Sequence, residues 1–380
     1  MLVKIFRKEK HIHPEVLHTD IVFLKTHKTA SSTFQNILFR FGEKHNLTFA
    51  FPYMTYQFIY PHDFMASFVA PLPLRAAGGR FHILSSHMRF QKDEVARVMS
   101  PMAMYLSIVR RPENNFESVF YYYESVVSAF DAAGKHSYGR DHLKTFLENA
   151  ETFYKLEKMP TAFVRNPMAF DFGLTPNISV SSDEFATGLA ELDAKFDLVM
   201  ITERFDESMI LAKEMLGWEM EDVVYLSTNK RAKTHTNKSF KRKNQHLTEM
   251  IRRWNALDVA LYEHFARRFQ RQVEAFGVGR MQREVDALRR KVSARREECV
   301  ANEVEAGMVN QSEIMPFIPG SVVVLGYNMR SGLNLRTRER CLRMLLPELK
   351  YHTRLFQRQY GSTVEEYNVG AKLSTTNETR

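Results

Sequence analysis

Short apolar runs alternate along the chain with segments whose apolar residues recur every three or four positions. The first run, residues 21–24, is continuous, which is typical of a strand buried on both faces of a parallel sheet. The next segment predicts a helix, because its apolar residues have the spacing i, i+3, i+4 and i+7. These residues are Phe34, Ile37, Leu38 and Phe41. Further strands are expected at residues 81–84, 104–109, 196–201 and 223–226.

Strands that alternate with helices favour an α/β fold in which helices flank a central, mostly parallel sheet. Helical spacing dominates toward the C-terminus. We expect a long helix with an apolar stripe from Trp254 to Phe265, a charged helix at residues 278–298 and a last helix at roughly residues 336–356. The sequence therefore predicts a helical C-terminal region beside the α/β core.

Three segments of different character divide the chain. Residues 1–20 are charged and show no periodicity, so we expect a stem or a disordered arm there. Residues 21–360 contain all of the predicted strands and helices and are expected to form the folded domain. Residues 361–380 are polar and are predicted to be a disordered tail.

The loop between the first strand and the first helix has the sequence KTHKTASST, residues 25–33. Free N–H groups and the helix dipole favour an anion at a helix N-terminus, and the lysines and hydroxyl groups of this loop add charge and donors. The loop contains no glycine, so it is not the G-x-x-x-x-G-K-[ST] loop of nucleotide hydrolases. Taken alone, the segment fits an anion site and an ordinary solvated turn equally well.

Polar residues also follow two later strands. His87 comes just after the strand predicted at residues 81–84, and Arg110 comes directly after the strand predicted at residues 104–109. Ligands of parallel sheets bind beyond the carboxyl ends of the strands. We therefore expect His87 and Arg110 to converge with Lys28 of the first loop at one edge of the sheet.

The chain carries a formal net charge of +9 and a pI near 9.3. This charge suits an anionic ligand or partner, although general solubility explains it equally well. Residues 228–243 hold seven Lys or Arg residues and no acid. A heparin- or RNA-binding protein would use such a run, and a P-loop-type nucleotide kinase would use the strand–loop–helix unit, so both remain alternatives.

Glycosylation motifs and the cysteine content bear on the compartment. Five N-x-[ST] motifs favour a lumenal or secreted protein. They begin at Asn46, Asn177, Asn237, Asn310 and Asn377. The sequence has only two cysteines, Cys299 and Cys341, without zinc-ligand spacing. No stretch is long and apolar enough for a signal peptide or membrane helix. We therefore expect either a cytosolic protein or a lumenal one given without its targeting segment.

Two ordered motifs resemble the sulfotransferases that use 3'-phosphoadenosine-5'-phosphosulfate (PAPS). One is the K-T-x-x-S/T-S/T loop that starts at Lys28, and the other is Arg110 followed eight residues later by Ser118. More narrowly, the chain resembles the galactose-3-O-sulfotransferase family between about residues 21 and 348. The segments that carry this resemblance are FLKTHKTASST, ILFRFGEKHNL, HMRF followed by DEV, FDES, LGWE, VEAFG and LGYN.

The resemblance implies a P-loop-like three-layer fold and two clamps on the donor nucleotide. Lys28 matches the lysine that the family places at the leaving 5'-phosphate, and Lys25 and His27 flank it. The residues that match the 5'-phosphate cradle are Thr29, Ala30, Ser31, Ser32 and Thr33. Arg110 and Ser118 match the residues that bind the 3'-phosphate, and Arg110 has the geometry for bidentate binding.

The acceptor hydroxyl needs a proton acceptor, and His87 aligns with the histidine that serves as the base in related glycan sulfotransferases. An unperturbed histidine pKa near ~6.5 suits this role. A purely structural histidine is the alternative reading. Glu94 or the neighbouring Asp93 is a second candidate, since other sulfotransferases use a carboxylate base. Candidates for an aromatic platform under galactose are Phe51, Tyr53, Phe90 and Tyr122.

The family also implies a set of partners and a location. The expected co-substrate is PAPS, without a metal, and the expected acceptor is galactosylceramide or another β-galactoside glycan, with no nucleic-acid partner and a possible homodimer. The family resides in the Golgi lumen, anchored by one N-terminal membrane helix that is absent from this sequence. Cys299 and Cys341 match family cysteine positions, which implies a disulfide that stabilises the fold by roughly 2–4 kcal/mol.

Overall fold

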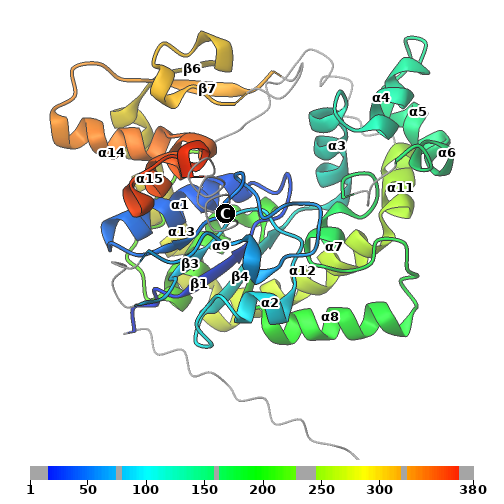
Figure 1. The fold of residues 1–380 in the computed structure, drawn as a ribbon, viewed down its shortest axis with the longest axis horizontal. Helices are drawn as coiled ribbons and strands as arrows, with labels where there is room; N and C mark the ends of the chain where they lie inside the picture. The colour runs from blue at the N-terminus through cyan, green and yellow to red at the C-terminus, as the bar shows by residue number, and fades with distance from the viewer. Residues whose placement is uncertain (1–15, 74–78, 158–161, 228–244, 318–322, 368–380) are drawn as a thin grey trace, which may run out of the picture.

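A computed structural model of the chain describes residues 16–73, 79–157, 162–227, 245–317 and 323–367. A parallel sheet with the strand order β2-β3-β1-β4-β5 lies at the centre of the described part (Figure 1). Its strands are β1 (Ile21–Leu24), β2 (Phe49–Ala50), β3 (Ile83–Leu84), β4 (Met104–Val109) and β5 (Leu198–Ile201). The predicted α/β class and parallel sheet are therefore confirmed.

Strand β1 lies in the middle of this sheet, and none of its four residues is exposed. It pairs in parallel with β3 on one side and with β4 on the other, in a register that sets Leu24 beside Ser107. The chain runs outward from β1 to the β2 edge, returns through β3 and then crosses to β4, so the direction of winding reverses between β1 and β4. Such a switch point opens a crevice at the carboxyl ends of the strands.

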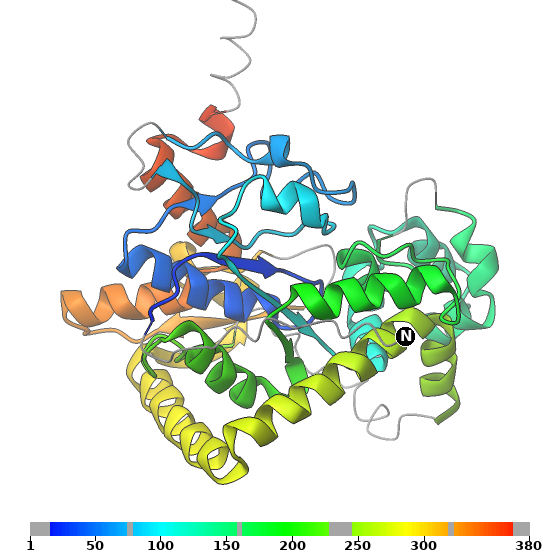
Figure 2. The same ribbon diagram turned by 90° about the horizontal axis from the view of Figure 1, so that it is seen from below.

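Helices flank the sheet and share its hydrophobic core. Helix α1 (Ser31–Lys44) packs against α14 (Leu335–Leu345) and α15 (Glu348–Tyr360), so the C-terminal helices lie beside the first helix of the domain (Figure 1). A separate group, in which α12 (Ala256–Phe276) contacts α9 (Phe205–Leu216) and β5, covers another part of the sheet, as Figure 2 shows from below. The C-terminal region is thus helical, as predicted.

A second, smaller core lies in a cluster of helices to one side of the sheet (Figure 1, right). It is built around the tilted and edge-packed rings of Phe120, Phe130 and Phe146. Its helices are α3 (Pro112–Tyr123), α4 (Ser128–Lys135), α5 (His142–Glu148), α6 (Ala150–Tyr154) and α11 (Gln245–Trp254). Other helices are α2 (Lys92–Ala96), α7 (Pro167–Asp171), α8 (Asp183–Lys195) and α13 (Val278–Cys299).

Two predicted helices are each divided in the structure. The stripe from Trp254 to Phe265 is interrupted at Asn255, where α11 ends and α12 begins, so that Trp254 packs in the helical cluster and Phe265 in the main core. The predicted helix at 336–356 is interrupted at Pro347, between α14 and α15. A proline has no N–H for an intrahelical bond and clashes with the preceding turn, which accounts for this second break.

The strand predicted at residues 223–226 does not form. Val223, Val224 and Leu226 are buried in the main core, but this segment has no strand partner among the residues that the structure describes. Burial by packing under helices produces the same apolar run as burial in a sheet, which is why the sequence pattern was misleading here. A two-stranded sheet that was not predicted lies beside α14, formed by the antiparallel strands β6 (Val300–Glu305) and β7 (Leu325–Met329).

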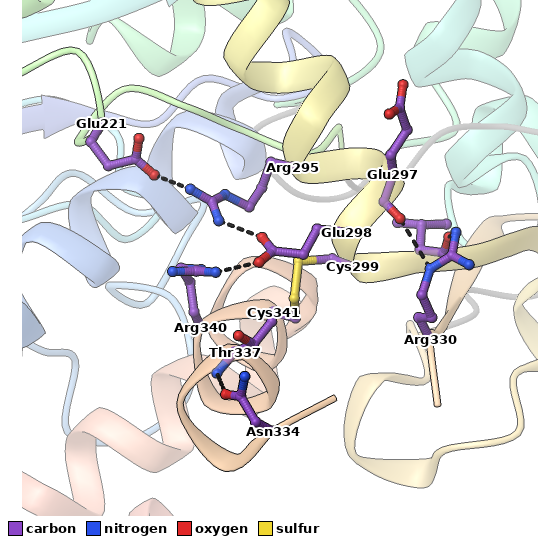
Figure 3. The surroundings of a disulfide bond; sticks show 11 residues. Glu221, Arg295, Glu297, Glu298, Cys299, Arg330, Asn334, Thr337, Arg340 and Cys341 are labelled. Atoms are coloured by element: carbon purple, nitrogen blue, oxygen red, sulfur yellow. Dashed lines mark hydrogen bonds and ion pairs between the residues drawn. A yellow bond between two sulfur atoms is a disulfide. The ribbon is translucent and has the colours of Figure 1, made fainter. Parts of the chain in front are cut away.

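A disulfide between Cys299 and Cys341 joins the end of α13 to α14 (Figure 3). Both cysteines are fully buried, and their Cα atoms are 5.2 Å apart. Beside the bond, the Glu298 carboxylate accepts hydrogen bonds from the guanidinium groups of Arg295 and Arg340, which link the same two helices. The predicted disulfide is therefore confirmed.

Both ends of the described chain contact the domain. His18 donates its N–H to the carbonyl of Leu216, and Asp20 accepts from the N–H of Met104, so residues 18–20 already run along the sheet. At the other end, Val364 is buried in the main core. Residues 1–15 and 368–380 lie outside the described residues, and the predicted arm and tail remain predictions there.

Candidate active site

The loop between β1 and α1 adopts left-handed backbone conformations without glycine. Lys28 has φ 60° and Ala30 has φ 66°, which is the left-handed region that non-glycine residues rarely occupy. Such strain concentrates at functional sites, and alternation of left- and right-handed residues makes a concave row of N–H groups. Ala30 is also the N-cap of α1, and its carbonyl accepts from the N–H of Thr33 in the first turn of that helix.

The carbonyl groups of this loop are each held by a neighbouring element. Asn115 donates to the carbonyl of His27, Arg110 to that of Lys28 at 3.0 Å, and Thr202 to that of Thr29 at 2.7 Å. In a trans peptide the following N–H points the opposite way. The N–H groups of residues 28–30 are therefore directed away from these three partners, an orientation that suits an anion on the opposite side of the loop.

Several loop hydroxyls serve the loop itself. Ser31 Oγ donates to the carbonyl of Thr26 at 2.6 Å, and Thr29 Oγ1 donates to the same carbonyl at 3.2 Å. Thr26 in turn donates to the carbonyl of Ile108 in β4 at 2.5 Å. For Thr29 and Ser31, a contact to an anion bound at this loop would therefore come from the backbone rather than from the hydroxyl.

A cavity of about 560 Å³ opens over this loop, at the switch point between β1 and β4. It is lined by ten of the eleven residues predicted for the site, namely Lys25, Lys28, Thr29, Ala30, Ser31, Ser32, Thr33, His87, Arg110 and Ser118. These residues come from four separate parts of the chain. The roles assigned to them in catalysis and nucleotide binding remain predictions.

Lys25 connects the predicted base to a carboxylate that the sequence analysis did not single out. Its side chain is 1% exposed, and its Nζ lies 2.7 Å from Nε2 of His87 and 2.9 Å from Oε2 of Glu348. Ser32 Oγ donates to the same Glu348 oxygen at 2.8 Å. An ammonium needs a carboxylate partner at such burial, and Glu348 supplies it.

His87 is held so that both ring nitrogens are engaged. Nδ1 donates to the carbonyl of Lys25 at 2.8 Å, which leaves Nε2 as the acceptor toward the Lys25 ammonium. Burial, together with the nearby charges of His27 and Lys25, holds the pKa of His87 well below its ordinary value. The imidazole is therefore neutral near pH 7, as a base must be.

A second histidine lies directly against His87. The rings of His27 and His87 are stacked, with centroids 3.8 Å apart. Asp171 of α7 accepts from the backbone N–H of His27 at 2.7 Å and lies 3.0 Å from its Nδ1, while Tyr60 donates to the same carboxylate. Nε2 of His27 is buried and has no hydrogen-bond partner among the described residues.

Lys28 and Arg110 bring positive charge to the cavity. The Lys28 ammonium lies 3.3 Å from the centre of the Tyr122 ring, a cation–π contact that holds the side chain over α3. Burial lowers the pKa of Arg110, yet an arginine remains charged at neutral pH. Ser118 of α3, eight residues after Arg110, lines the same cavity.

Glu94, the alternative base, is not brought to the cavity. It lies in α2, where its carboxylate accepts from the N–H of Ala66 and from Arg97 at 2.7 Å each. We therefore give Glu94 no part in the proposal below.

Glu348, Asp171 and Thr202 are site residues that sequence reasoning missed. Pro347 was the available signal for Glu348, because a proline in a helical pattern marks a helix start, and acids are favoured in the first turn. Asp171 lies in a segment without a distinctive pattern, so no local signal could have identified it. The basic run at 228–243 lies outside the described residues.

Potential metal ligands cluster at one place among the described residues. This group consists of Glu298, Cys299 and Cys341. The two sulfur atoms are bonded to each other, so they are not available to a metal. That the reaction needs no metal remains a prediction.

Comparisons with known proteins show the family of this chain. A family model described as galactose-3-O-sulfotransferase matches residues 11–359. Galactosylceramide sulfotransferase of Bos taurus is 41% identical over 335 residues, which are 87% of this chain and 77% of that protein. Galactose-3-O-sulfotransferase 3 of Mus musculus is 37% identical over 354 residues, which are 91% of this chain and 79% of that protein. The chain therefore belongs to the galactose-3-O-sulfotransferase family.

Proposed function

We propose that this protein transfers the sulfuryl group of PAPS to the 3-hydroxyl of a terminal β-galactose. The observation that carries the proposal is the meeting of the Lys28 loop with Arg110 and Ser118 in one cavity that also contains His87. A donor with phosphates at both the 3' and 5' positions needs two separate clamps. The loop N–H groups and Lys28 are suited to the 5' end, and Arg110 with Ser118 is suited to the 3' end.

The transfer proceeds by in-line displacement, as in phosphoryl transfer. Negative charge develops on the leaving 5'-phosphate and on the sulfuryl oxygens, and Lys28 provides a cation there. The acceptor hydroxyl attacks from the opposite side and loses its proton to a histidine. PAPS supplies the activated sulfuryl group, and the chain supplies binding, orientation and charge.

We propose His87 as the proton acceptor. Its Nε2 already accepts from Lys25 in the structure, so the acceptor hydroxyl can reach this atom only when the Lys25 ammonium turns aside. The negative sulfuryl group provides an alternative partner for that ammonium. His27 is the second candidate, because Asp171 holds its Nδ1 and its Nε2 has no partner among the described residues.

The acceptor class follows from the relatives. Those named above are called galactosylceramide sulfotransferase and galactose-3-O-sulfotransferase 3. We propose a terminal β-galactoside as the shared acceptor, with galactosylceramide as its first candidate. We also propose the Golgi lumen as the site of action. Among the helices that the structure describes, none has the length and apolar character needed to cross a bilayer.

The alternative of a nucleotide kinase has no support in the cavity. Such enzymes hold Mg²⁺ through a Ser/Thr hydroxyl and an acid beside the phosphates. Among the described residues that line the cavity, Glu348 is the one carboxylate, and it is paired with Lys25. Nothing in the described part of the site therefore favours ATP over PAPS.

Transfer of radiolabelled sulfate from PAPS tests the function directly. Galactosylceramide, lactosylceramide and type 1, type 2 and core 1 disaccharides should be compared, with the corresponding glucosides as controls. The expected result is labelled product at the galactose 3-hydroxyl of at least one acceptor. Retention on immobilised 3',5'-ADP that ATP does not compete away is the accompanying binding test. Absence of transfer to every galactoside would contradict the proposal.

Arg110→Ala is expected to weaken nucleotide binding more than it slows turnover. The guanidinium supplies charged hydrogen bonds to the 3'-phosphate, each worth roughly 1.5–3 kcal/mol, or about ten- to a hundredfold in affinity. Calorimetric titration with 3',5'-ADP measures the effect, and 5'-AMP, which lacks the 3'-phosphate, provides the control ligand. An equal loss for both ligands would place Arg110 elsewhere, since it also holds the carbonyl of Lys28.

The acid limb of the pH–rate profile is expected well below pH 6.5. Burial, His27 and Lys25 lower the pKa of His87, so the active neutral form persists on acidification and is lost only when pH falls through the lowered pKa. The measurement is kcat/KM from acidic to mildly alkaline pH, with stability monitored in parallel. An inflection at or above the ordinary histidine value would argue against His87 in its observed surroundings.

A further inference from the structure

Glu348 is placed in the cavity by the break at Pro347. Helix α15 begins at this residue, 316 positions after Ser32, and its carboxylate reaches the first turn of α1. One oxygen, Oε2, accepts both from Lys25 Nζ at 2.9 Å and from Ser32 Oγ at 2.8 Å. The carboxylate is thus fixed in position by two residues of the loop that is proposed to bind the donor.

Glu348 is an acid, whereas the other charged side chains that line the described part of the cavity are basic. Burial alone would raise its pKa, but Lys25 and the hydrogen bonds from Lys25 and Ser32 outweigh burial and lower it, so the group is ionised. Among the described residues that line the cavity it is the one carboxylate, surrounded by Lys25, Lys28 and Arg110. A polyanionic donor gains nothing from a carboxylate, because like charges repel. A neutral sugar does gain, since its hydroxyls donate and a carboxylate is a strong acceptor.

The position of Glu348 relative to His87 suits a sugar. Both residues contact the single Nζ atom of Lys25, at 2.7 Å from His87 Nε2 and 2.9 Å from Glu348 Oε2. The two acceptor atoms are therefore separated by less than about 6 Å. Adjacent hydroxyls of one pyranose ring can hydrogen-bond to two acceptors at such a spacing. When one hydroxyl of the sugar hydrogen-bonds to His87, the adjacent hydroxyl of the same pyranose ring therefore lies within reach of Glu348.

We propose that Glu348 binds the acceptor galactose by accepting a hydrogen bond from a hydroxyl next to the reacting 3-hydroxyl, at position 2 or 4. This inference rests on the proposed function and adds the residue that orients the sugar. Ser32 still holds the carboxylate when Lys25 turns toward the sulfuryl group, so that recognition of the acceptor is coupled to the donor loop. The C-terminal helix α15 thereby contributes to acceptor selection.

The test combines Glu348→Gln with deoxygenated acceptors. The amide keeps the shape of the side chain and removes its charge. A hydrogen bond to a charged group is expected to be worth about ten- to a hundredfold in acceptor KM. For the unmodified enzyme, the KM of either the 2-deoxy or the 4-deoxy galactoside should be about tenfold or more above the KM of the parent galactoside. With Glu348→Gln, the KM values of the same analogue and its parent should differ by less than about threefold, because the carboxylate that would accept the hydrogen bond is already absent.

The matched control is Glu365→Gln, which changes an exposed carboxylate after α15 and should leave both acceptors unaffected. Binding of 3',5'-ADP and the thermal midpoint are measured for each variant. If Glu348→Gln retains the discrimination between parent and analogue, the proposal is wrong. It is also wrong if the whole loss appears as weaker 3',5'-ADP binding, which would assign Glu348 to the donor side.

Two outcomes separate this inference from the proposed function. If the unmodified enzyme transfers sulfate to galactosides but treats both deoxy analogues like their parent, the function stands and the Glu348 contact is rejected. This result does not depend on whether Glu348→Gln folds. If the unmodified enzyme transfers no sulfate to any galactoside, the proposed function itself fails.

Discussion

Lys28→Ala is expected to reduce sulfate transfer by at least about a thousandfold while 3',5'-ADP still binds. Removal of a single preorganised group at a developing negative charge typically slows the reaction by ~10²–10³-fold. Removal of a full positive charge at the leaving phosphate should slow it by as much as the upper end of this range or more. Ground-state binding should fall less, because the loop N–H groups and Arg110 remain. The measurement is single-turnover transfer of labelled sulfate at saturating PAPS, with calorimetric titration of 3',5'-ADP.

The control for this variant is Lys135→Ala, which removes an equally flexible lysine that is 72% exposed in the helical cluster. It should leave both turnover and nucleotide binding unchanged. Lys28→Arg retains the charge but changes its shape, and it should recover part of the rate. Turnover of Lys28→Ala within tenfold of the unmodified enzyme would mean that another cation, most directly Lys25, stabilises the leaving group.

His87→Asn is expected to slow transfer by about 10²–10⁴-fold, the usual contribution of a general base. Asparagine is chosen because its amide N–H can replace the Nδ1–H that donates to the carbonyl of Lys25. The substitution therefore removes the proton acceptor at Nε2 while leaving the local support of the loop in place. The residual rate should rise as the pH is raised above neutrality, because hydroxide then assists deprotonation.

The fold of this variant is monitored by its thermal midpoint and by 3',5'-ADP binding, both of which should stay close to those of the unmodified protein. His87→Ala provides the comparison and should also lose stability, since it removes the hydrogen bond and the stacking against His27. Near-normal turnover of His87→Asn at neutral pH would show that the base is another residue. His27 is then the next residue to substitute, with Asp171→Asn as its partner variant.

The longer strands of the sheet could be predicted from the sequence, because parallel strands that are buried on both faces require continuous apolar runs. The runs at 21–24 and 104–109 agree with β1 and β4 residue for residue. The run at 223–226 shows the limit of this argument, because packing under helices imposes the same apolar requirement without any strand partner. The two-residue strand β2 is too short to leave any pattern.

Two helix ends are determined by the single residues Asn255 and Pro347, and the apolar periodicity of the sequence does not reveal their effect. The stripe through Trp254 and Phe265 continues across Asn255, although the two sides of that residue belong to different cores. Asn255 bonds both to the carbonyl of Ile251 and to the N–H of Asn166, and these contacts stabilise the break. Pro347 was visible in the sequence, but its consequence for the site was not, since that depended on where α15 would dock.

By itself, the sequence determined the α/β class, the family and most of the residues that line the cavity. These features depend on local order along the chain: apolar runs, the loop from Lys25 to Thr33, and the Arg110–Ser118 spacing. Only the tertiary structure decided which atoms of the cavity residues form hydrogen bonds and which residues from distant parts of the chain contact them. Glu348 joins Lys25, and Asp171 joins His27, across more than 140 residues. Such pairings arise from the packing of helices against the sheet, so no local pattern records them.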